Sequence, residues 1–374
     1  MSIDTDRTAD RTARLAPPAR LRRVVALGAS AGGVEALTRV VRELPASFGA
    51  PILVVLHVPP TAVSRLPEIL RRAGAMPASH AEHGAVPEAG HIYVAPPDRH
   101  MVINDGRIVL IEGPHENGVR PAVDPLFRSV AAGYRQRALG AVLSGTLDDG
   151  TAGIAAIRAK GGVSVAQEPS DAIAPGMPMS AIENVGVDYV VRAGDMPPLF
   201  ARFVAGNLRR MATRRAPTAL SEVAGNGDWG ADRQLPAWSS ETSAPTDLVC
   251  PECGGVIRQF VDNGVLRFHC RVGHSYSPAA LYAAQDGRLE AALWAAIRSL
   301  EESASLARRL ADAARQRGSR FTARKYEDRE REAAERADVV RSALLALTPL
   351  DETPAVAEPE AVLTEMRRSR KSAG

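Results

Sequence analysis

The feature that most constrains the fold is an alternation of short apolar runs with helix-like segments between residues 23 and 207. Each run has the length of a β-strand and is apolar at successive positions, so both of its faces should be buried. The strand-length runs are residues 24–27, 52–56, 91–95, 138–143, 163–167 and 187–191. The helical segments between them are residues 33–44, 62–73, 123–136, 151–159, 178–184 and 197–208. This alternation predicts a doubly wound α/β fold, a mostly parallel sheet with helices on both sides.

Outside this α/β domain the composition changes several times. Residues 101–111 fall inside the domain but should form a local hairpin, because Asp105-Gly106 supplies the positive φ of a tight turn. A charged, pattern-free leader, an Arg-, Pro- and Gly-rich linker and a similar tail are expected to be disordered or unstructured. The predicted divisions are a leader at 1–22, the α/β domain at 23–207, a linker at 208–246, a cysteine-containing module at 247–277, a helical hairpin at 278–347 and a tail at 348–374.

The helical hairpin is predicted from a segment almost free of Gly and Pro that is interrupted at residues 316–319. Apolar residues recur in its first half at mostly helical spacing, with Glu and Arg at the positions between them. They are expected to form the apolar face of the helix and are Leu289, Leu293, Ile297, Leu300, Leu306 and Leu310.

Charge and hydropathy argue against two classes of partner. The chain has 46 Lys and Arg residues against 43 Asp and Glu, which gives a net charge of +3 and too weak a field to predict nucleic-acid binding. No stretch reaches the roughly 18 uncharged apolar residues that a membrane span needs, and no apolar signal core follows the N-terminus. We therefore expect a cytoplasmic protein that neither binds nucleic acid nor inserts into a membrane.

A glycine-rich turn at residues 28–33, Gly-Ala-Ser-Ala-Gly-Gly, follows the first predicted strand and begins a helix. A nucleophile elbow needs this context, because glycine tolerates the strained turn that lifts a serine hydroxyl out of the sheet edge. A dinucleotide-binding loop is the rival interpretation. It is less favoured, because Ser30 stands where that loop needs its second glycine, and His57 follows the next strand where an acidic residue is expected.

His57 and the aspartates of residues 144–150 each follow a predicted strand. The carboxyl ends of parallel strands meet at one crevice, so an imidazole, a carboxylate and the Ser30 hydroxyl can meet there. The carboxylate loop also suits a turn that caps the helix starting at Thr151, and this structural role is compatible with catalysis.

Residues 23–204 resemble the catalytic domain of CheB-type protein-glutamate methylesterases, which cleave methyl esters from glutamates of chemoreceptors. The resemblance rests on motifs in unbroken order across roughly half the chain. These motifs are the elbow at 28–33, Leu-His-Val-Pro-Pro at 56–60, Tyr-Val-Ala-Pro-Pro-Asp-Arg-His-Met at 93–101, Arg-Pro-Ala-Val-Asp at 120–124 with Leu126-Phe127, the loop at 144–150 and Pro-Gly-Met-Pro at 175–178.

The resemblance implies that Ser30 is the nucleophile, His57 the base and Asp149 the orienting carboxylate, with no cofactor needed for catalysis. It implies methylated chemoreceptor-like proteins as substrates and leaves deamidation of glutamine open. Only about 22 residues precede the α/β domain, so the receiver domain that usually controls such enzymes is expected to be absent. Ala31 and Thr146 replace a common Thr and Met beside the expected oxyanion region, where the backbone N–H of residue 31 remains available as a donor.

Three further residues of the α/β domain are ambiguous from sequence. Arg99 and Arg120 could position an acidic substrate, but pairing with Asp98 and Asp124 is slightly favoured. His100 could equally line the site or pack in the interior.

The three cysteines of the chain all lie between residues 250 and 270. Cys250 and Cys253 are separated by two residues, and Cys270 is followed by His274, a spacing that suits a structural zinc ion with four ligands. His269 is the alternative fourth ligand. The expected module is a small zinc ribbon that depends on its metal to fold, while catalysis should proceed without that metal.

Two functions from different classes remain. The first is an active protein-glutamate methylesterase. The second is a non-catalytic regulatory or scaffold protein of a chemosensory or two-component pathway, whose zinc ribbon and helices bind signalling proteins. Intact Ser30, His57 and Asp149 favour the enzyme, because a scaffold has no need of all three.

Overall fold

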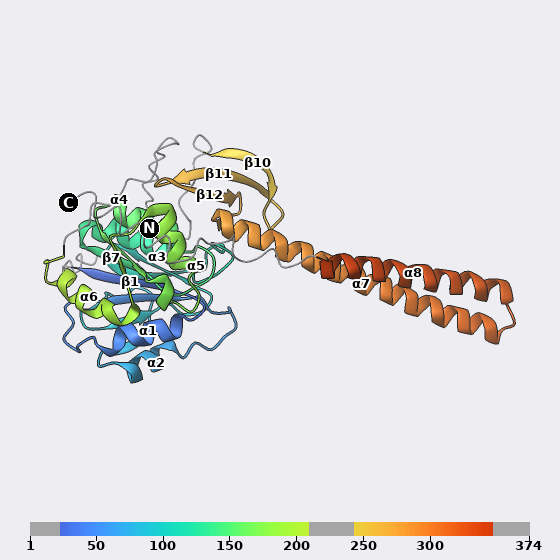
Figure 1. Cartoon of the computed structure of the whole chain (residues 1–374), viewed down its shortest axis with the longest axis horizontal. Helices are drawn as coiled ribbons and strands as arrows, with labels where there is room; N and C mark the ends of the chain where they lie inside the picture. The colour runs from blue at the N-terminus through green and yellow to red at the C-terminus, as the bar shows by residue number, and fades with distance from the viewer. Residues whose placement is uncertain (1–22, 209–242, 347–374) are drawn as a thin grey trace, which may run out of the picture.

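The computed structural model describes residues 23–208 and 243–346 (Figure 1). The predicted leader and tail, and most of the predicted linker, lie outside these residues. The α/β domain contains a seven-stranded sheet in the order β3-β4-β2-β1-β7-β8-β9, and every pairing in it is parallel. Its strands are β1 (Val24–Ala29), β2 (Ile52–Leu56), β3 (Ala78–His80), β4 (Ile92–Val94), β7 (Ala138–Val142), β8 (Val163–Gln167) and β9 (Tyr189–Val191). The predicted α/β class is confirmed, and β3, a three-residue edge strand, is the one strand of this sheet that the apolar runs did not indicate.

Helices cover both faces of the sheet, as the doubly apolar strands require. Along β1, Val25 and Leu27 join the core under one set of helices, whereas Val24 and Ala26 join the core under the other. Figure 1 places α3 and α4 above the sheet and α1 and α2 below it. The helices are α1 (Gly33–Arg42), α2 (Leu66–Ala73) and α6 (Met196–Val204) on one side, and α3 (Val123–Tyr134), α4 (Thr151–Ala159) and α5 (Gly176–Ser180), which continues into a π-helical turn (Ala181–Val185), on the other.

The strand order reverses at the middle of the sheet. β1 pairs with β2 on one side and with β7 on the other, so the chain winds outward in both directions from this point. In open parallel sheets, ligands bind outside the carboxyl ends of the strands at such a switch point. The residues that follow β1, β2 and β7 are therefore the ones placed to form a site.

The local hairpin is also confirmed. It consists of β5 (His100–Asn104) and β6 (Arg107–Ile111), which pair antiparallel. Asp105 and Gly106 have φ values of 48° and 74°, the left-handed pair that a two-residue hairpin turn needs.

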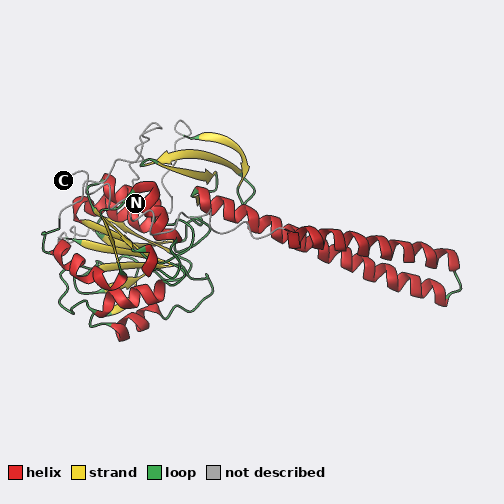
Figure 2. Ribbon diagram, viewed as in Figure 1, coloured by secondary structure: helices red, strands yellow, loops and turns green. Residues whose placement is uncertain are grey.

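The C-terminal part contains a small antiparallel sheet and two long helices (Figure 2). The sheet strands are β10 (Ala244–Val249), β11 (Val256–Asp262), β12 (Val265–Cys270) and β13 (Ser275–Tyr276). β10 begins within the last residues of the predicted linker. We call residues 243–277 the ribbon. Helix α7 (Pro278–Gln316) and helix α8 (Arg320–Ala346) form a hairpin that extends away from the α/β domain.

The hairpin buries only part of the apolar face predicted for its first helix: Ile297 is buried, and Leu293 and Leu300 are half-buried. Leu289, Leu306 and Leu310 remain 50%, 59% and 36% exposed. Beyond Ile297, the buried positions of α7 are small residues at steps of three and four, which lets α7 and α8 approach closely. They are Ala304, Ala307, Ala311 and Ala314, and α8 buries Ala323 and Ala337. None of the helices in the described ranges combines the length and the apolarity needed to cross a bilayer.

Candidate active site

Strand register brings residues 30 and 57 to the same edge of the sheet. Ala29 of β1 pairs with Leu56 of β2, and the His57 N–H donates to the Ala29 carbonyl at 3.1 Å. On the other side of β1, the Ser30 N–H donates to the carbonyl of Ser144 at 2.9 Å. Ser30 therefore stands at the switch point, between the ends of β2 and β7, where the sequence placed it.

The turn after Ser30 depends on glycine. Gly32 has a φ of 69° and precedes the first residue of α1, and a Cβ there would lie 2.5 Å from Ile173 and 2.7 Å from the Ser144 hydroxyl. Because the backbone angle and the space both exclude a larger residue, the chain turns sharply at this point. Ser30 is left half-buried at the N-terminus of α1, whose unpaired N–H groups favour a nearby negative charge.

His57 and Asp149 form the central contact of the site. Nε2 of His57 lies 2.7 Å from Oδ2 of Asp149, and their side chains are 14% and 3% exposed. Because Nε2 faces the carboxylate, it carries the proton of this hydrogen bond and Nδ1 is the nitrogen left to act as a base. In the described part of the chain, no hydrogen bond joins the Ser30 hydroxyl to His57.

Asp149 is fixed by the N-terminus of α3. Its two carboxylate oxygens accept the backbone N–H groups of Val123 at 2.6 Å and Asp124 at 3.1 Å. Burial opposes ionisation of Asp149, but the hydrogen bond and charge of His57 and the Val123 N–H outweigh it and hold its pKa well below the usual value. Asp149 is therefore an ionised carboxylate with a fixed orientation.

The close approach of α3 depends on Gly28 in β1. A Cβ on Gly28 would lie 2.2 Å from Cγ1 of Val123, the first residue of α3. A larger residue there would push back the helix end that holds Asp149. Gly28 thus acts in the helix packing behind the elbow as well as in the turn itself.

Asn117 is a site residue that sequence reasoning missed. Its Nδ2 donates to Oδ1 of Asp149 at 2.8 Å and to Oδ2 of Asp124 at 3.2 Å. Its backbone is left-handed, with a φ of 55°, which asparagine tolerates better than most residues. The preference of Asn for this conformation before Gly118 was the available signal, but it indicates a turn and not a contact with Asp149.

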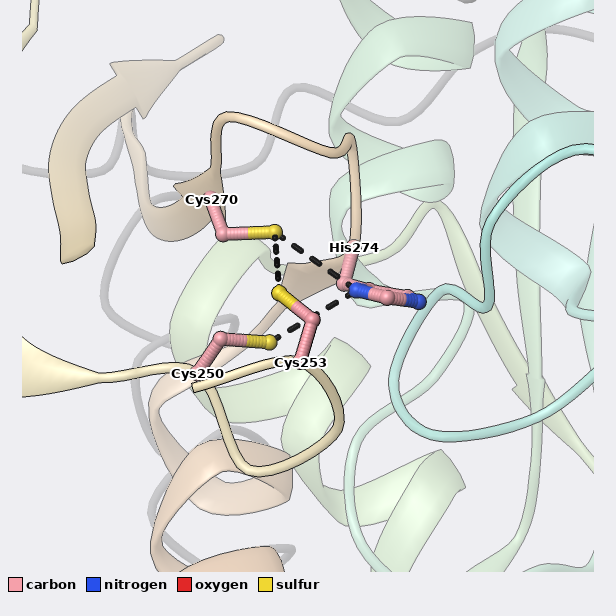
Figure 3. A group of neighbouring side chains, drawn as sticks. All are labelled: Cys250, Cys253, Cys270 and His274. Carbon is pink, nitrogen blue, oxygen red and sulfur yellow. Dashed lines mark hydrogen bonds between the residues drawn. The ribbon is translucent and has the colours of Figure 1, made fainter. Parts of the chain in front are cut away.

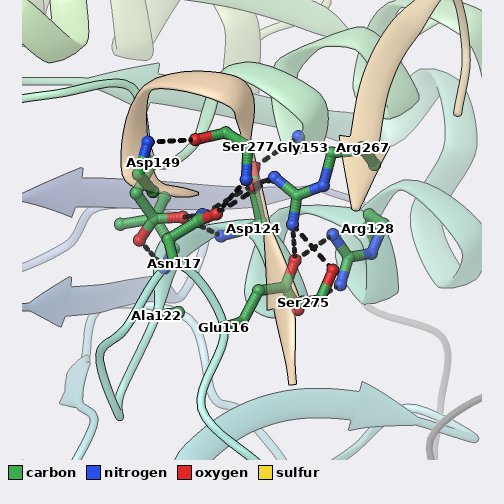
Figure 4. Close-up of polar contacts among 12 residues, drawn as sticks. Glu116, Asn117, Ala122, Asp124, Arg128, Asp149, Gly153, Arg267, Ser275 and Ser277 are labelled. Carbon is green, nitrogen blue, oxygen red and sulfur yellow. Dashed lines mark hydrogen bonds and ion pairs between the residues drawn. The ribbon is translucent and has the colours of Figure 1, made fainter. Parts of the chain in front are cut away.

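Behind Asp149 lies a buried cluster of charged residues (Figure 4). Arg128 pairs with Glu116 through two hydrogen bonds of 2.6 Å, and Arg267 pairs with Glu116 at 2.5 Å and with Asp124 at 2.8 Å. Burial raises the pKa of Asp124 to about 7, with Arg267 opposing the rise and the Asp149 carboxylate adding to it. Arg128 and Arg267 overcome the effect of burial on Glu116 and keep its pKa below the usual value. Arg267 was not predicted, and it comes from β12 of the ribbon.

The two candidate arginines pair with acidic side chains, and one of these is an expected partner. Arg120 donates to Asp98 at 2.9 Å, and Arg99 pairs with Glu112. Of the two expected carboxylates, Asp98 thus has one of these arginines as its partner, whereas Asp124 does not, because Arg267 takes the place beside it.

His100 is fully enclosed. Its Nε2 donates to the Pro114 carbonyl at 3.0 Å, and its Nδ1 accepts the Ala122 N–H at 3.2 Å. Burial lowers the pKa of His100, which favours the neutral ring that this arrangement needs. Of the two alternatives left open by the sequence, the interior packing role fits this geometry.

Ala31 and Thr146 lie on loops at the switch point, and both are exposed. The carbonyl of Ala31 accepts the Ser144 hydroxyl at 2.7 Å, which ties the elbow to the loop after β7. The next residue of that loop, Gly145, is also close, since a Cβ on it would lie 2.9 Å from Cβ of Ser30. The loop that carries Thr146 therefore starts directly beside the serine.

The ribbon brings together a group that could hold a metal ion, formed by Cys250, Cys253, Cys270 and His274 (Figure 3). Their ligand atoms all lie within 4.8 Å of one another. His269, the alternative ligand, is not in this group and packs edge-on against Phe260 at 5.1 Å. Nε2 of His274 lies 3.1 Å from the carboxylate of Glu252, the kind of outer contact that orients a metal-binding imidazole.

The fold and the site define an α/β protein with a histidine–carboxylate pair and a serine elbow at the switch point of a parallel sheet. The CheB methylesterase family model matches residues 25–200. A Leptospira interrogans relative, provisionally named a protein-glutamate methylesterase/protein-glutamine glutaminase, is 33% identical over 187 residues, which are 50% of this chain and 97% of the relative. The chain belongs to the CheB methylesterase family.

Other relatives are similar over the same domain. The protein-glutamate methylesterase/protein-glutamine glutaminase of Pyrococcus abyssi is 38% identical over 205 residues, which are 52% of this chain and 55% of the relative. The chain thus spans about half the length of this curated relative. The crystal structure of the Thermotoga maritima CheB methylesterase catalytic domain matches 48% of this chain and 97% of its own, with 32% identity and a TM-score of 0.47.

Proposed function

We propose that this protein hydrolyses glutamate methyl esters on chemoreceptor-like proteins, with Ser30 as nucleophile, His57 as base and Asp149 as the orienting carboxylate. The observation that carries the proposal is the 2.7 Å hydrogen bond between His57 and Asp149 at the strand end next to Ser30. An imidazole held by a buried carboxylate beside a serine elbow is the arrangement that serine hydrolases use.

The proposed reaction has two steps. Nδ1 of His57 takes the hydroxyl proton of Ser30 as the serine oxygen attacks the ester carbonyl, and the protonated imidazole, stabilised by Asp149, returns the proton to the leaving methoxide. Methanol departs and leaves an acyl-enzyme. Water that His57 deprotonates then releases the glutamate and frees Ser30. The backbone N–H of Ala31, at the start of α1, is the proposed donor to the oxyanion in both steps.

Deamidation of glutamine would follow the same route with ammonia as the leaving group. The names of the Pyrococcus and Leptospira relatives include a protein-glutamine glutaminase activity. We propose it as a secondary activity of the same Ser30 site. Thr146 and Ala31 replace common family residues beside the oxyanion region, so they are the proposed determinants of the ratio between the two activities.

The test is methanol release from methylated chemoreceptor fragments by the full chain, compared with the Ser30→Ala variant. Methanol release by the wild-type protein and its loss in Ser30→Ala are expected. Release at the wild-type rate by Ser30→Ala would remove Ser30 from the reaction. A wild-type protein that releases no methanol and does not react with a serine-directed phosphonate would instead favour the non-catalytic scaffold.

We further propose that the cysteine–histidine group of the ribbon holds a structural zinc ion. In a tetrahedral site with Zn–S of about 2.3 Å and Zn–N of about 2.0–2.1 Å, sulfur atoms lie about 3.8 Å apart and sulfur lies about 3.6 Å from nitrogen. Sγ of Cys253 and Cys270 are separated by 3.6 Å, and Nδ1 of His274 lies 3.6 Å from Cys250 and 3.5 Å from Cys270. All four ligand positions would come from the protein, so zinc would stabilise the ribbon and take no direct part in ester hydrolysis.

Binding of chemosensory proteins by α7 and α8 stays a prediction.

A further inference from the structure

Two buried ion pairs join the ribbon to the α/β domain. Arg267 of β12 is 2% exposed and contacts Asp124 at 2.8 Å and Glu116 at 2.5 Å, both of them buried residues of the α/β domain. Exposed ion pairs are worth little, but a buried charge that loses its partner is strongly unfavourable. Without the ribbon, the interior of the α/β domain would therefore contain a buried carboxylate, Asp124, that lacks its ion-pair partner.

The charges of the cluster show what Arg267 supplies. The α/β domain itself provides three buried carboxylates, Glu116, Asp124 and Asp149, and a single guanidinium, Arg128, within hydrogen-bond reach of them. Arg267 adds the second positive charge. It lies beside Asp124, whose backbone N–H holds the Asp149 carboxylate. Neutralisation of these buried carboxylates thus depends on a residue outside the α/β domain.

Asn117 links the ribbon to Asp149 by a second route. Its Oδ1 accepts the backbone N–H of Ser277 at 2.8 Å and Nη1 of Arg267 at 3.3 Å. Since the amide oxygen accepts from two residues of the ribbon, the amide nitrogen, Nδ2, is directed toward Asp149. A chain of hydrogen bonds therefore runs from Ser277 through Asn117 and Asp149 to His57.

The backbone secures this junction. Ser275 of β13 pairs with the loop of the α/β domain that contains Glu116, through the Asn117 N–H to the Ser275 carbonyl at 2.7 Å and the Ser275 N–H to the His115 carbonyl at 3.2 Å. The Ser277 hydroxyl contacts the Asp148 carboxylate, next to Asp149. The ribbon is thus joined to both loops that hold the orienting carboxylate.

We propose that the ribbon is a working part of the hydrolytic site, in which Arg267 is a positioning residue that fixes Asp149 through Asp124 and Asn117. The proposal rests on the proposed methylesterase function. It replaces the expectation that hydrolysis proceeds without the metal, because Arg267 lies three residues before the ligand Cys270, and Ser275 directly follows the ligand His274. Loss of the metal should displace both contact residues.

The test compares full-length Arg267→Met and Arg267→Lys with Arg271→Met. Arg271 is exposed on the same ribbon, so its variant makes the same change of charge away from the cluster. We expect Arg267→Met to lower kcat by about 10²-fold with little change in KM, because the orienting group is misplaced while the substrate surface is intact. Arg267→Lys should recover part of this loss by restoring the charge without the two-armed geometry, and Arg271→Met should be unchanged.

Two readouts separate positioning from a merely structural role. The imidazole proton shared by His57 and Asp149 should give a downfield proton resonance in the wild type that shifts or broadens in Arg267→Met. The acid limb of the kcat/KM profile should move to higher pH, because removal of a nearby cation raises the pKa of both Asp124 and Asp149 relative to the wild type. The charged groups that face these carboxylates are His57, Glu116, Arg128, Asp148 and Arg267, with His100 and Asp262 next to them.

A folded Arg267→Met variant with wild-type kcat, resonance and pH profile would overturn the proposal. If Arg267→Met does not fold, the Arg267→Lys variant provides the test. Wild-type kcat, resonance and pH profile in Arg267→Lys would show that the two-armed contact is not needed. Failure of the proposed function looks different, since the wild type itself would then release no methanol. The metal link is tested with Cys253→Ser, which should lose zinc and kcat together and shift the same resonance; lost zinc with an unchanged resonance would contradict it.

Discussion

Asp149 and His57 lie 92 positions apart in the chain, and a 2.7 Å hydrogen bond joins Oδ2 of the first to Nε2 of the second. The contact exists because β2 ends at Leu56, while Asp149 occupies the loop before α4 and accepts the N–H groups that begin α3. Burial and the N–H donors of Val123, Asp124 and Asn117 fix the Asp149 carboxylate, and the carboxylate in turn fixes the His57 ring. The consequence is that Nδ1 of His57, and not Nε2, is the nitrogen available to Ser30.

The first prediction concerns Ser30 and His57. Ser30→Ala and His57→Gln should each lower kcat by about 10⁴- to 10⁶-fold, and the double variant should be little worse than either, because triad residues act as a unit. Turnover of a small methyl ester and labelling by a serine-directed phosphonate measure this. Additive losses, or labelling of a residue other than Ser30, would contradict the assigned roles.

A second prediction follows from the buried Asp124, whose pKa is raised to about 7. A carboxyl with a higher pKa in the folded than in the unfolded state binds its proton more tightly when folded, so its contribution to stability is present below pH 4 and is lost as the pH rises toward 7. The slope is at most about 1.4 kcal/mol per pH unit. Asp124→Asn should remove this component of the pH dependence, as measured by urea unfolding between pH 4 and 8. An identical pH dependence in both proteins would show that Asp124 does not titrate in this range.

Gly28→Ala tests the approach of α3 to the sheet. The added Cβ would lie 2.2 Å from Val123, so we expect a loss of about 1–3 kcal/mol in the free energy of unfolding and a fall in kcat as Asp149 moves. Gly194→Ala is the matched control, since a Cβ at Gly194 has no atom within 4 Å. Thermal unfolding and ester turnover of both variants provide the measurement, and equal behaviour of the two would argue against a tight contact at Gly28.

The metal prediction concerns the ribbon. Elemental analysis should find about one zinc per chain, and Cys253→Ser should reduce it sharply because one of four ligands is lost. Zinc binding supplies on the order of 10 kcal/mol to small modules of this kind, so a strong chelator should unfold residues 243–277 before the α/β domain. Val256→Ser, at an exposed ribbon position, should retain its zinc and is the control. A ribbon that stays ordered in zinc-free protein, as amide exchange would report, is incompatible with this role.

Local patterns predicted most elements of the α/β domain. The apolar run that became β8 and the helical segment that became α4 were placed at the bounds that the structure has. The exceptions have physical reasons. The three-residue β3 contains Ser79 and His80 and so lacks an apolar run. In α7 the predicted face includes the buried Ile297, but beyond it the prediction took leucines in place of the buried alanines, because alanine has too little apolar surface to stand out in a pattern.

The sequence by itself determined the class of fold, the elbow at Ser30, the histidine and carboxylate at strand ends, and the spacing of the proposed metal ligands. Each of these depends on neighbours within a few positions or on the fixed geometry of a parallel sheet. Only the tertiary structure decided that His274 joins the thiols and that Arg267 lies beside Asp124, 143 positions away. An arginine in a short strand has the same sequence pattern whether it faces water or a buried carboxylate, and the docking of the ribbon on the loops around Asn117 and Asp149 decides which it is.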